Sequence, residues 1–169
     1  MKTLILIGAR NSGKTQTIGK SRNKGLKGRF KHIKNGRLFS RHEKLILTYI
    51  SSCQEQVKFC HVDDLVKCIE HRIEIAKKAS ADLLIQPFTV ERNRAKQLNK
   101  DCIIEALKTL KSHGVAVTLV HIQRTDAAGA SDIDAFVKSL DPDAVVIKSE
   151  KNYEKQADRL LEVVDKLLR

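Results

Sequence analysis

Tryptophan is absent from this 169-residue chain, and aromatic residues make up only 4% of it. Hydrophobic residues nevertheless make up 41%, which excludes an intrinsically disordered chain, so the core must be built mainly from leucine, isoleucine and valine. The length fits one α/β domain of ordinary size. No internal repeat and no linker rich in proline, glycine or serine divides the chain, and we therefore expect a single domain over residues 1–169.

Long hydrophobic runs are also missing, since crossing a bilayer takes about 18 to 20 apolar residues. The apolar run after Lys2 stops at Ile7, too short for the central region of a secretory signal peptide. The four cysteines, at positions 53, 60, 68 and 102, form no Cys-x-x-Cys pair and fit no zinc-binding spacing. These absences predict a cytoplasmic protein with reduced thiols and no membrane partner.

Acidic residues are scarce in the first third of the chain. Residues 1–60 contain 14 lysines or arginines but only Glu43 and Glu55 as acids, whereas the two signs balance over residues 61–169. The whole formal net charge of +12 therefore belongs to the first third. Residues 20–44, called the basic segment below, hold ten of these basic residues, and a concentrated positive field attracts polyanions such as nucleic acid.

The basic segment contains Asn35-Gly36, the favoured pair for a type I′ hairpin turn. Such a turn would place Ile33 opposite Leu38 and produce a basic β-hairpin or arm. Phe30 and Phe39 are candidates to stack on the bases of a bound nucleic acid. The alternative is a basic surface that binds nothing specific.

Elsewhere apolar runs alternate with amphipathic helical patterns, which is typical of a parallel sheet with helical crossovers. We expect Pro87 to end a strand, Gly114 to end a helix, and Ser131 to cap the start of the next helix. The expected strands are residues 4–7, 44–52, 82–88, 115–122 and 144–147. The expected helices are residues 14–20, 61–78, 103–114, 131–140 and 153–168.

One motif carries the chemistry: residues 8–15 read Gly-Ala-Arg-Asn-Ser-Gly-Lys-Thr and match G-x-x-x-x-G-K-[ST] in full. It follows an apolar strand and opens a helix. Gly8 and Gly13 allow backbone dihedrals that a Cβ would forbid, so that the loop can curl around a phosphate. Backbone N–H groups from Asn11 to Thr15 would point into that curl, where the positive end of the helix dipole adds to them.

Two side chains of the motif have expected roles. The Lys14 ammonium would bridge the β- and γ-phosphates, and the Thr15 hydroxyl would coordinate Mg²⁺. The expected nucleotide-binding residues are Gly8, Ala9, Arg10, Asn11, Ser12, Gly13, Lys14, Thr15 and Gln16.

On this motif and the α/β alternation, the chain resembles the P-loop NTPase superfamily. The resemblance implies an α/β fold, a three-layer α/β/α sandwich with a mostly parallel sheet, here with a basic β-hairpin insertion. It also implies Mg²⁺ with ATP or GTP, bound at the carboxyl edge of the sheet. It does not choose between a hydrolase, a kinase and a switch.

Such enzymes carry an acid at the end of a second buried strand, where it supports Mg²⁺ or its water. No clean candidate exists here. Glu55, beyond the strand at 44–52, is the first choice, and Gln86, near the expected end of the strand at 82–88, is the second. Lys14 and Glu55 are therefore the expected catalytic residues.

Small GTPases offer one comparison within the superfamily. Gln123-Arg124-Thr125-Asp126 stands where that family has N-K-x-D, with Asp126 alone retained from its fixed residues, and Ser149-Glu150-Lys151 stands where it has S-A-K. Residues 49–56 lack the Asp and Gly of D-x-x-G-Q-E, and residues 18–47 contain no threonine. These departures favour ATP over GTP.

Nucleotide and polynucleotide kinases offer another comparison, because Arg92, Arg94 and Arg124 follow strands and would lie at the carboxyl edge of the sheet. The sequence thus predicts Mg-dependent binding and hydrolysis of a nucleoside triphosphate, on or near nucleic acid. The alternatives are such a kinase, a degenerate GTPase-like protein, and a nucleotide-dependent binding module without hydrolysis.

Overall fold

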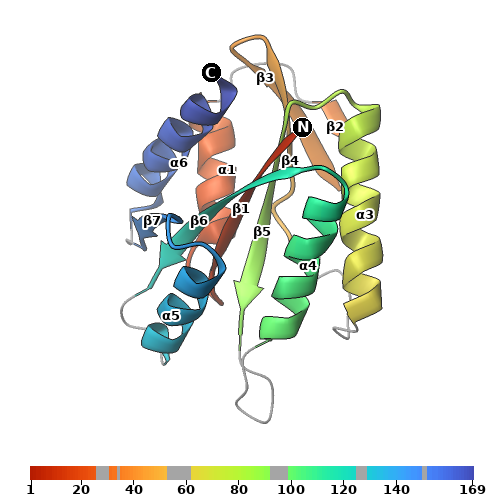
Figure 1. Cartoon of the computed structure of the whole chain (residues 1–169). Helices are drawn as coiled ribbons and strands as arrows, with labels where there is room; N and C mark the ends of the chain where they lie inside the picture. Colours follow the sequence, from red (N-terminus) through yellow and green to blue (C-terminus); the bar gives the residue numbers. More distant parts are fainter. Residues whose placement is uncertain (26–30, 34, 53–61, 92–98, 125–128, 150–151) are drawn as a thin grey trace.

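The computed structural model forms a seven-stranded sheet with helices on both of its faces (Figure 1). It describes residues 1–25, 31–33, 35–52, 62–91, 99–124, 129–149 and 152–169. The strands are β1 (Lys2–Ala9), β2 (Lys31–Ile33), β3 (Gly36–Arg41), β4 (Lys44–Thr48), β5 (Leu83–Val90), β6 (Ala116–Gln123) and β7 (Val145–Lys148). The helices of the described residues are α1 (Lys14–Gly25), α3 (Val62–Lys78), α4 (Lys100–Ser112), α5 (Ala130–Leu140) and α6 (Tyr153–Leu168).

The strands lie in the order β2-β3-β4-β5-β1-β6-β7. β4, β5, β1, β6 and β7 are parallel, whereas β2 and β3 extend the sheet in antiparallel pairing. The fold is therefore the expected mostly parallel α/β sheet with a basic antiparallel extension at one edge. Within the described residues, no helix combines the length and the apolar character needed to cross a membrane.

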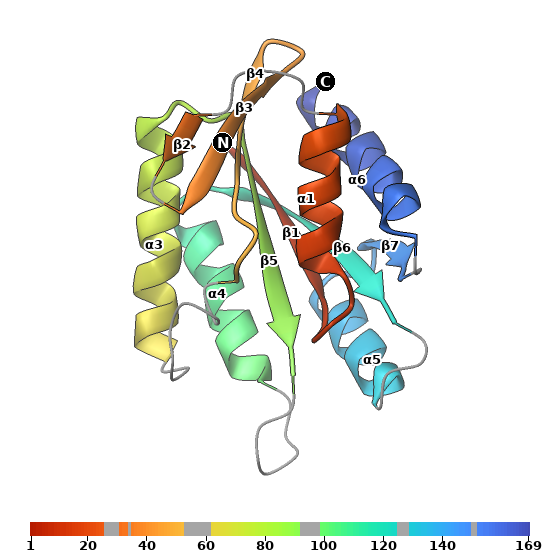
Figure 2. The ribbon, with the colours of Figure 1, turned by 180° about the vertical axis from the view of Figure 1, so that it is seen from behind.

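Three layers follow from the alternation of side chains along β1, whose successive residues point to opposite faces of the sheet. Leu4 and Leu6 pack into a buried cluster with α1 and α6, while Ile5 and Ile7 pack into another with α3, α4 and α5. The two helix layers are seen from opposite sides in Figures 1 and 2. All of these β1 side chains are fully buried, because both faces of the strand are covered.

The basic segment forms the expected antiparallel pair of strands, β2 and β3, but in a different register. Ile33 pairs with Gly36 rather than with Leu38, so the predicted register was wrong by two residues. Gly36 is a strand residue, and a Cβ built on it would lie 3.0 Å from Leu47 Cδ1 and 3.1 Å from Tyr49 Cζ. Packing of these large neighbours against the bare glycine backbone thus fixes the register.

The tight turn with positive φ lies instead between β3 and β4. His42 has φ 50° and Glu43 has φ 62°, and the flanking Arg41 and Lys44 pair across the hairpin. Two successive positive φ values are what a two-residue type I′ connection requires. The turn chemistry predicted for Asn35-Gly36 is therefore found seven residues further on, at His42-Glu43.

β5 runs through Pro87 to Val90, so the prediction that Pro87 ends the strand was wrong. In a parallel ladder the N–H and C=O groups of successive residues point to alternate sides. The Ile85 carbonyl accepts from the Tyr49 N–H on the β4 side, so the Pro87 nitrogen faces that same side. The β4 ladder has already ended there, at Thr48 opposite Ile85, and the missing N–H costs no ladder bond.

Helix ends are partly as expected. α4 ends in a Schellman motif in which Gly114 has φ 68° and donates to Lys111 O at 3.0 Å, while Val115 N donates to Leu110 O at 3.1 Å. The residue before α5 is Gly129, with φ 75°, so Ser131 lies inside the first turn and is not the cap. α6 has the predicted bounds, and the Asn152 side chain caps it by accepting from Glu154 N.

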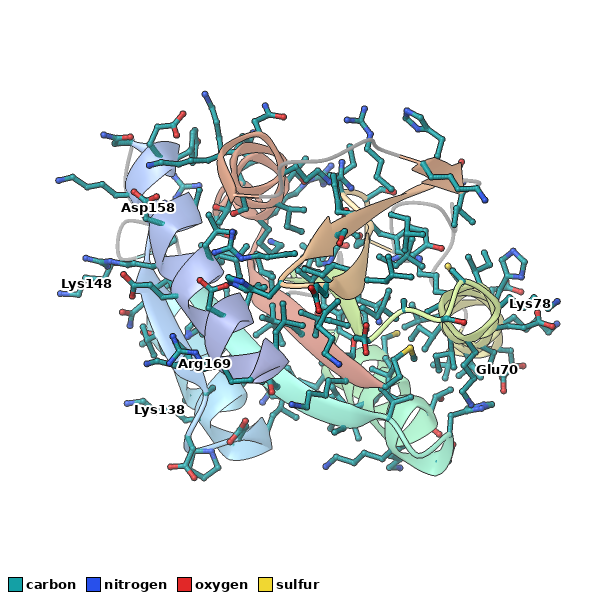
Figure 3. The ribbon with its side chains drawn as sticks, turned by 90° about the horizontal axis from the view of Figure 1, so that it is seen from above. Glu70, Lys78, Lys138, Lys148, Asp158 and Arg169 are labelled. Atoms are coloured by element: carbon teal, nitrogen blue, oxygen red, sulfur yellow. The ribbon has the colours of Figure 1, made fainter. Side chains whose placement is uncertain are left out.

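The charge of the basic segment is partly offset by α6, which lies beside α1 with Asp158 on its surface (Figure 3). Lys24 lies 2.6 Å from the Asp158 carboxylate and Arg41 lies 2.6 Å from that of Asp165. Phe39 is only 2% exposed and belongs to the core, so its predicted role in stacking on bases was wrong. Phe30 lies outside the described residues.

Candidate functional site

The glycine-rich loop connects the end of β1 to the start of α1. Asn11 and Gly13 have positive φ values of 59° and 89°, which curl the backbone, and Ser12 N donates to Ala9 O at 3.2 Å across the curl. Gly8 has no positive φ, in contrast to the expectation. Its Cβ would instead lie 2.5 Å from the carbonyl oxygen of Ile122 on β6, so this glycine is required by close approach of two strands.

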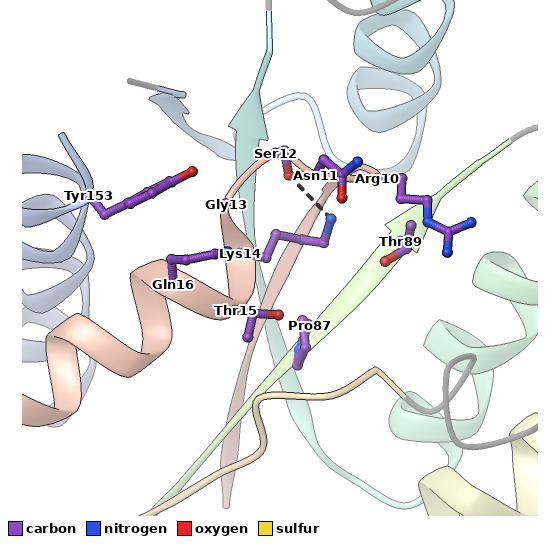
Figure 4. A pocket seen from close by; sticks show the side chains of 10 residues that line it. All are labelled: Arg10, Asn11, Ser12, Gly13, Lys14, Thr15, Gln16, Pro87, Thr89 and Tyr153. Atoms are coloured by element: carbon purple, nitrogen blue, oxygen red, sulfur yellow. Dashed lines mark hydrogen bonds between the residues drawn. The ribbon is translucent and has the colours of Figure 1, made fainter. Parts of the chain in front are cut away.

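Lys14 occupies the centre of the curl. Its Nζ donates to Gly8 O at 3.0 Å, to Ala9 O at 2.6 Å and to Ser12 Oγ at 3.2 Å, and the residue is only 6% exposed. The dashed line in Figure 4 marks the contact with Ser12. A cation held by backbone carbonyls keeps the loop open and places positive charge at its floor.

Thr15 is exposed in the first turn of α1, and its Oγ1 donates to the carbonyl oxygen of Ile50 at 3.1 Å. The segment that follows β4 therefore runs directly beside the loop. Because the hydroxyl proton is engaged with Ile50, the oxygen lone pairs are directed elsewhere and can accept a cation. This geometry suits the predicted role of Thr15 as a ligand of Mg²⁺.

A cavity of about 470 Å³ opens above the loop, within the usual size range of small-molecule sites. Figure 4 shows that the side chains around it come from β5 and α6 as well as from the loop. Its lining residues are Arg10, Asn11, Ser12, Gly13, Lys14, Thr15, Gln16, Pro87, Thr89 and Tyr153. The structure thus brings most of the predicted nucleotide-binding residues together around one cavity.

Three lining residues were missed by sequence reasoning: Pro87, Thr89 and Tyr153. The strand was expected to stop at Pro87, and this placed the carboxyl edge of β5 too early. The apolar and β-branched run Phe-Thr-Val after Pro87 was the signal that the strand continues. Tyr153 was placed at the start of the last helix, but nothing in the sequence indicates that this helix begins beside the loop.

α6 and the end of β7 hold the loop from one side. Thr17 Oγ1 contacts the buried Gln156 Oε1 at 2.7 Å, and Ser149 Oγ donates to Ser12 O at 3.0 Å. A Cβ on Gly13 would lie 2.6 Å from the Tyr153 ring. These contacts join the first and last elements of the chain, and they fix the position of the loop before any ligand binds.

Behind the loop lies His121, which is buried at the carboxyl end of β6. Burial lowers the pKa of His121, and the nearby Lys14 lowers it further, while Asp134, 3.5 Å away, acts in the opposite direction. His121 is therefore neutral at pH 7, and it adds no positive charge to the site.

Two residues were expected to take the role of the acid at a second strand. Glu55 lies outside the described residues. Gln86 is fully buried in the middle of β5, where its Oε1 accepts from Arg72 Nη1 at 3.3 Å, so it was wrongly placed near the carboxyl edge. The first acid beyond β5 is Glu91, whose carboxylate lies 4.0 Å from Arg10 Nη1 at the rim of the cavity.

Other predicted residues are less informative. Arg92, Arg94 and Asp126 lie outside the described residues, while Arg124 is half-buried just beyond β6. In the described part of the chain, no group of three or more His, Cys, Asp or Glu side chains is arranged to hold a metal. Among the described residues, Thr15 is a side chain that could hold a Mg²⁺ ion together with the phosphates of a ligand and water, which is the usual manner for this ion.

Comparison with solved structures identifies the fold. A de novo designed P-loop protein matches with a TM-score of 0.54 at 14% identity, over 99% of this chain and 95% of that one. Another design, of the P-loop NTPase fold, matches at 0.51 and 18% identity, over 98% and 92%. A sugar kinase from Janibacter sp. HTCC2649 matches at 0.50 and 13% identity, over 98% and 95%. No family model and no curated protein matches the sequence.

The chain therefore has the P-loop NTPase fold, as its motif and its sheet order indicate together.

Proposed function

We propose that this protein binds a nucleoside triphosphate with Mg²⁺ in the cavity above the loop, with ATP preferred to GTP, and hydrolyses it slowly. The observation that carries the proposal is the position of Lys14. Its ammonium is held by two loop carbonyls at the floor of a 470 Å³ cavity, where it would meet the β- and γ-phosphates. Backbone N–H groups and the start of α1 would surround the same phosphates.

Mg²⁺, when bound, would neutralise charge on the phosphate oxygens. Thr15 is the residue of this chain that would hold it. Tyr153 and Gln16 form the wall towards α6, where the ring would lie beside the nucleoside. The preference for ATP rests on the replacement of Asn and Lys by Gln123 and Arg124 at the end of β6, since those two family residues are part of the guanine-reading motif.

Slow turnover follows from the residue at the end of β5. Thr89 lines the cavity there, opposite Gly8 in the strand register. A threonine hydroxyl orients Mg²⁺ and its water less firmly than a carboxylate, and positioning supplies most of the rate in phosphoryl transfer. We expect turnover well below about 10 s⁻¹, the median for enzymes.

A thermal-shift series with ATP, GTP and dNTPs, each with and without Mg²⁺, tests binding. Analysis of the products then separates the remaining functions: free phosphate indicates a hydrolase, a labelled acceptor indicates a kinase, and neither indicates a binding module. Absence of any shift at millimolar nucleotide would contradict the proposal. Turnover above about 10 s⁻¹ without a partner would show that a catalytic carboxylate does support the ion.

A further inference from the structure

A second cavity, of about 360 Å³, adjoins the first. The two share Thr15, Gln16 and Tyr153, so a ligand in one would lie against a ligand in the other. The second cavity runs along α1 towards the antiparallel edge of the sheet. Its remaining lining residues are Gly19, Lys20, Arg22, Asn23, Arg37 and Ile50.

Two of its cations have no carboxylate partner among the residues that the structure describes. Lys20 is paired with Glu154 of α6 at 2.8 Å, and the neighbouring Lys24 is paired with Asp158. Arg22 and Arg37, by contrast, make no ion pair with any carboxylate in the described ranges. Positive charge that is neutralised elsewhere on α1 is therefore left unbalanced in this cavity.

Arg22 is held rigidly although it is buried. Its Nε donates to Thr48 Oγ1 at 2.8 Å and its Nη2 donates to Thr48 O at 3.0 Å, while the guanidinium lies 5.7 Å from the centre of the Phe39 ring. Burial, and then the charge of Arg37, lower the pKa of Arg22 to about 10. The guanidinium is still charged at pH 7, and two like charges close together in a half-enclosed space favour an anion between them.

Gly19 indicates that the space is kept open. It lies in the interior of α1, where glycine is less favourable than alanine. A Cβ built on Gly19 would meet nothing within 4 Å, so no neighbouring element requires the glycine. The volume that a side chain would take is instead volume of the second cavity.

We propose that this second cavity binds a small phosphomonoester beside the nucleotide, with its phosphate between Arg22 and Arg37 and its carbon skeleton against Gly19, Ile50 and Tyr153. Guanidinium groups match the geometry of a phosphate and donate paired hydrogen bonds to it. The proposal extends the proposed function by naming the chemical class of a second ligand. Binding of that ligand is measurable whether or not a nucleotide binds.

The test is calorimetric titration of the whole protein with ribose 5-phosphate, with ribose as the uncharged control. AMPPNP and Mg²⁺ are added first, so that the P-loop cavity cannot take the phosphate. We expect Arg37→Gln to weaken ribose 5-phosphate binding by roughly 10- to 100-fold, the loss expected for a charge-assisted contact. Lys31→Gln removes an equal charge from the exposed strand β2, outside the cavity, and should change the affinity by less than about threefold.

Two substitutions at Gly19 separate filling of the cavity from damage to the helix. Gly19→Ala should raise the melting temperature and retain binding, whereas Gly19→Leu should remove binding at an unchanged AMPPNP affinity. Equal binding by the parent and Arg37→Gln would overturn the proposal. So would loss of all ribose 5-phosphate binding when AMPPNP is present, or no binding by the parent at about 10 mM.

A failure of the proposed nucleotide binding can be distinguished from a failure of this inference. If AMPPNP does not bind, the same titration is run in a Lys14→Ala background, which removes the anion site of the loop. The comparison of Arg37→Gln with Lys31→Gln then decides the inference by itself, since neither residue touches the loop.

Discussion

The Thr15 hydroxyl and the Ile50 carbonyl oxygen lie 3.1 Å apart, so that the proposed Mg²⁺ ligand is oriented by the backbone that follows β4. Thr15→Ser keeps this donor, so this variant should still bind nucleotide more tightly with Mg²⁺ than without it. Thr15→Val keeps the shape but loses the oxygen, and should reduce the ratio of affinities with and without Mg²⁺ by about tenfold or more. Nucleotide titrations in Mg²⁺ and in EDTA measure the ratio. An unchanged ratio in Thr15→Val would remove Thr15 from the metal site.

Substitution of Lys14 tests the proposed phosphate-binding site. Lys14→Ala should abolish detectable binding of ATP and GTP, because the cation at the floor of the cavity is lost. It also removes the ammonium donor from the Gly8 and Ala9 carbonyls, of which Ala9 O still accepts from Ser12 N, at a cost of about 1 to 3 kcal/mol in the free energy of unfolding.

Lys24→Ala on the same helix is the matched control, since Lys24 pairs with Asp158 on the surface. It should bind nucleotide normally and lose at most about 1 kcal/mol. Circular dichroism establishes that both variants are folded. ATP binding by a folded Lys14→Ala protein at the parent affinity would contradict the phosphate-binding role of the loop.

Sequence reasoning succeeded where a local pattern determines the outcome. The motif from Gly8 to Thr15 and the apolar period of α6 are local, and both were placed correctly. It failed where a distant neighbour decides: Tyr49 and Leu47 set the register at Gly36, and the early end of β4 lets β5 continue through Pro87. The approach of Tyr153 to Gly13 joins residues 140 positions apart, and no pattern within either segment encodes it.

Gly36 offers a direct measure of that distant packing. Gly36→Ala should destabilise the protein by about 1 to 3 kcal/mol, because the added methyl group lies 3.0 Å from Leu47 and 3.1 Å from Tyr49, both fully buried. Urea denaturation measures the change. A Cβ on Gly19 meets no neighbour, so Gly19→Ala should instead stabilise the protein. Equal effects of the two changes would show that Gly36 is not held by its neighbours.

Asp165 links α6 to the hairpin turn and predicts a dependence of stability on pH. Hydrogen bonding from Arg41 lowers the pKa of Asp165. Its stabilisation is therefore complete above the unfolded pKa of about 3.9 and is lost as pH falls through the lower folded value. Asp165→Asn should cost about 1 to 2 kcal/mol at pH 7.

Urea denaturation of the parent and Asp165→Asn at a series of pH values checks this. The difference between them should shrink as pH falls below about 4. A difference that stays constant down to about pH 2 would mean that Asp165 acts through packing rather than through its charge.

Nucleic-acid binding by the basic segment stays a prediction. Charge reversal of Lys27, Arg29, Lys31 and Lys34 to Glu should abolish oligonucleotide binding and leave ATP binding intact. Four phosphate contacts would give a slope of about −3 in log affinity against log salt, or a loss of roughly 50- to 150-fold over a fourfold rise in salt. Fluorescence anisotropy at several salt concentrations measures this. A flat titration at low salt would identify the segment as a basic surface without this partner.

The bond between Thr17 and Gln156 spans 139 positions, and it has a consequence for how the protein is made. A ribosome adds about 5 to 20 residues each second, so the loop emerges on the order of ten seconds before the helix that completes its wall. During that interval Leu6 and Ile18 lack their α6 covering, and the cavity lacks Tyr153. A nucleotide that met the chain before α6 had formed would therefore lack the contact with Tyr153, and we expect it to bind less tightly than to the folded protein.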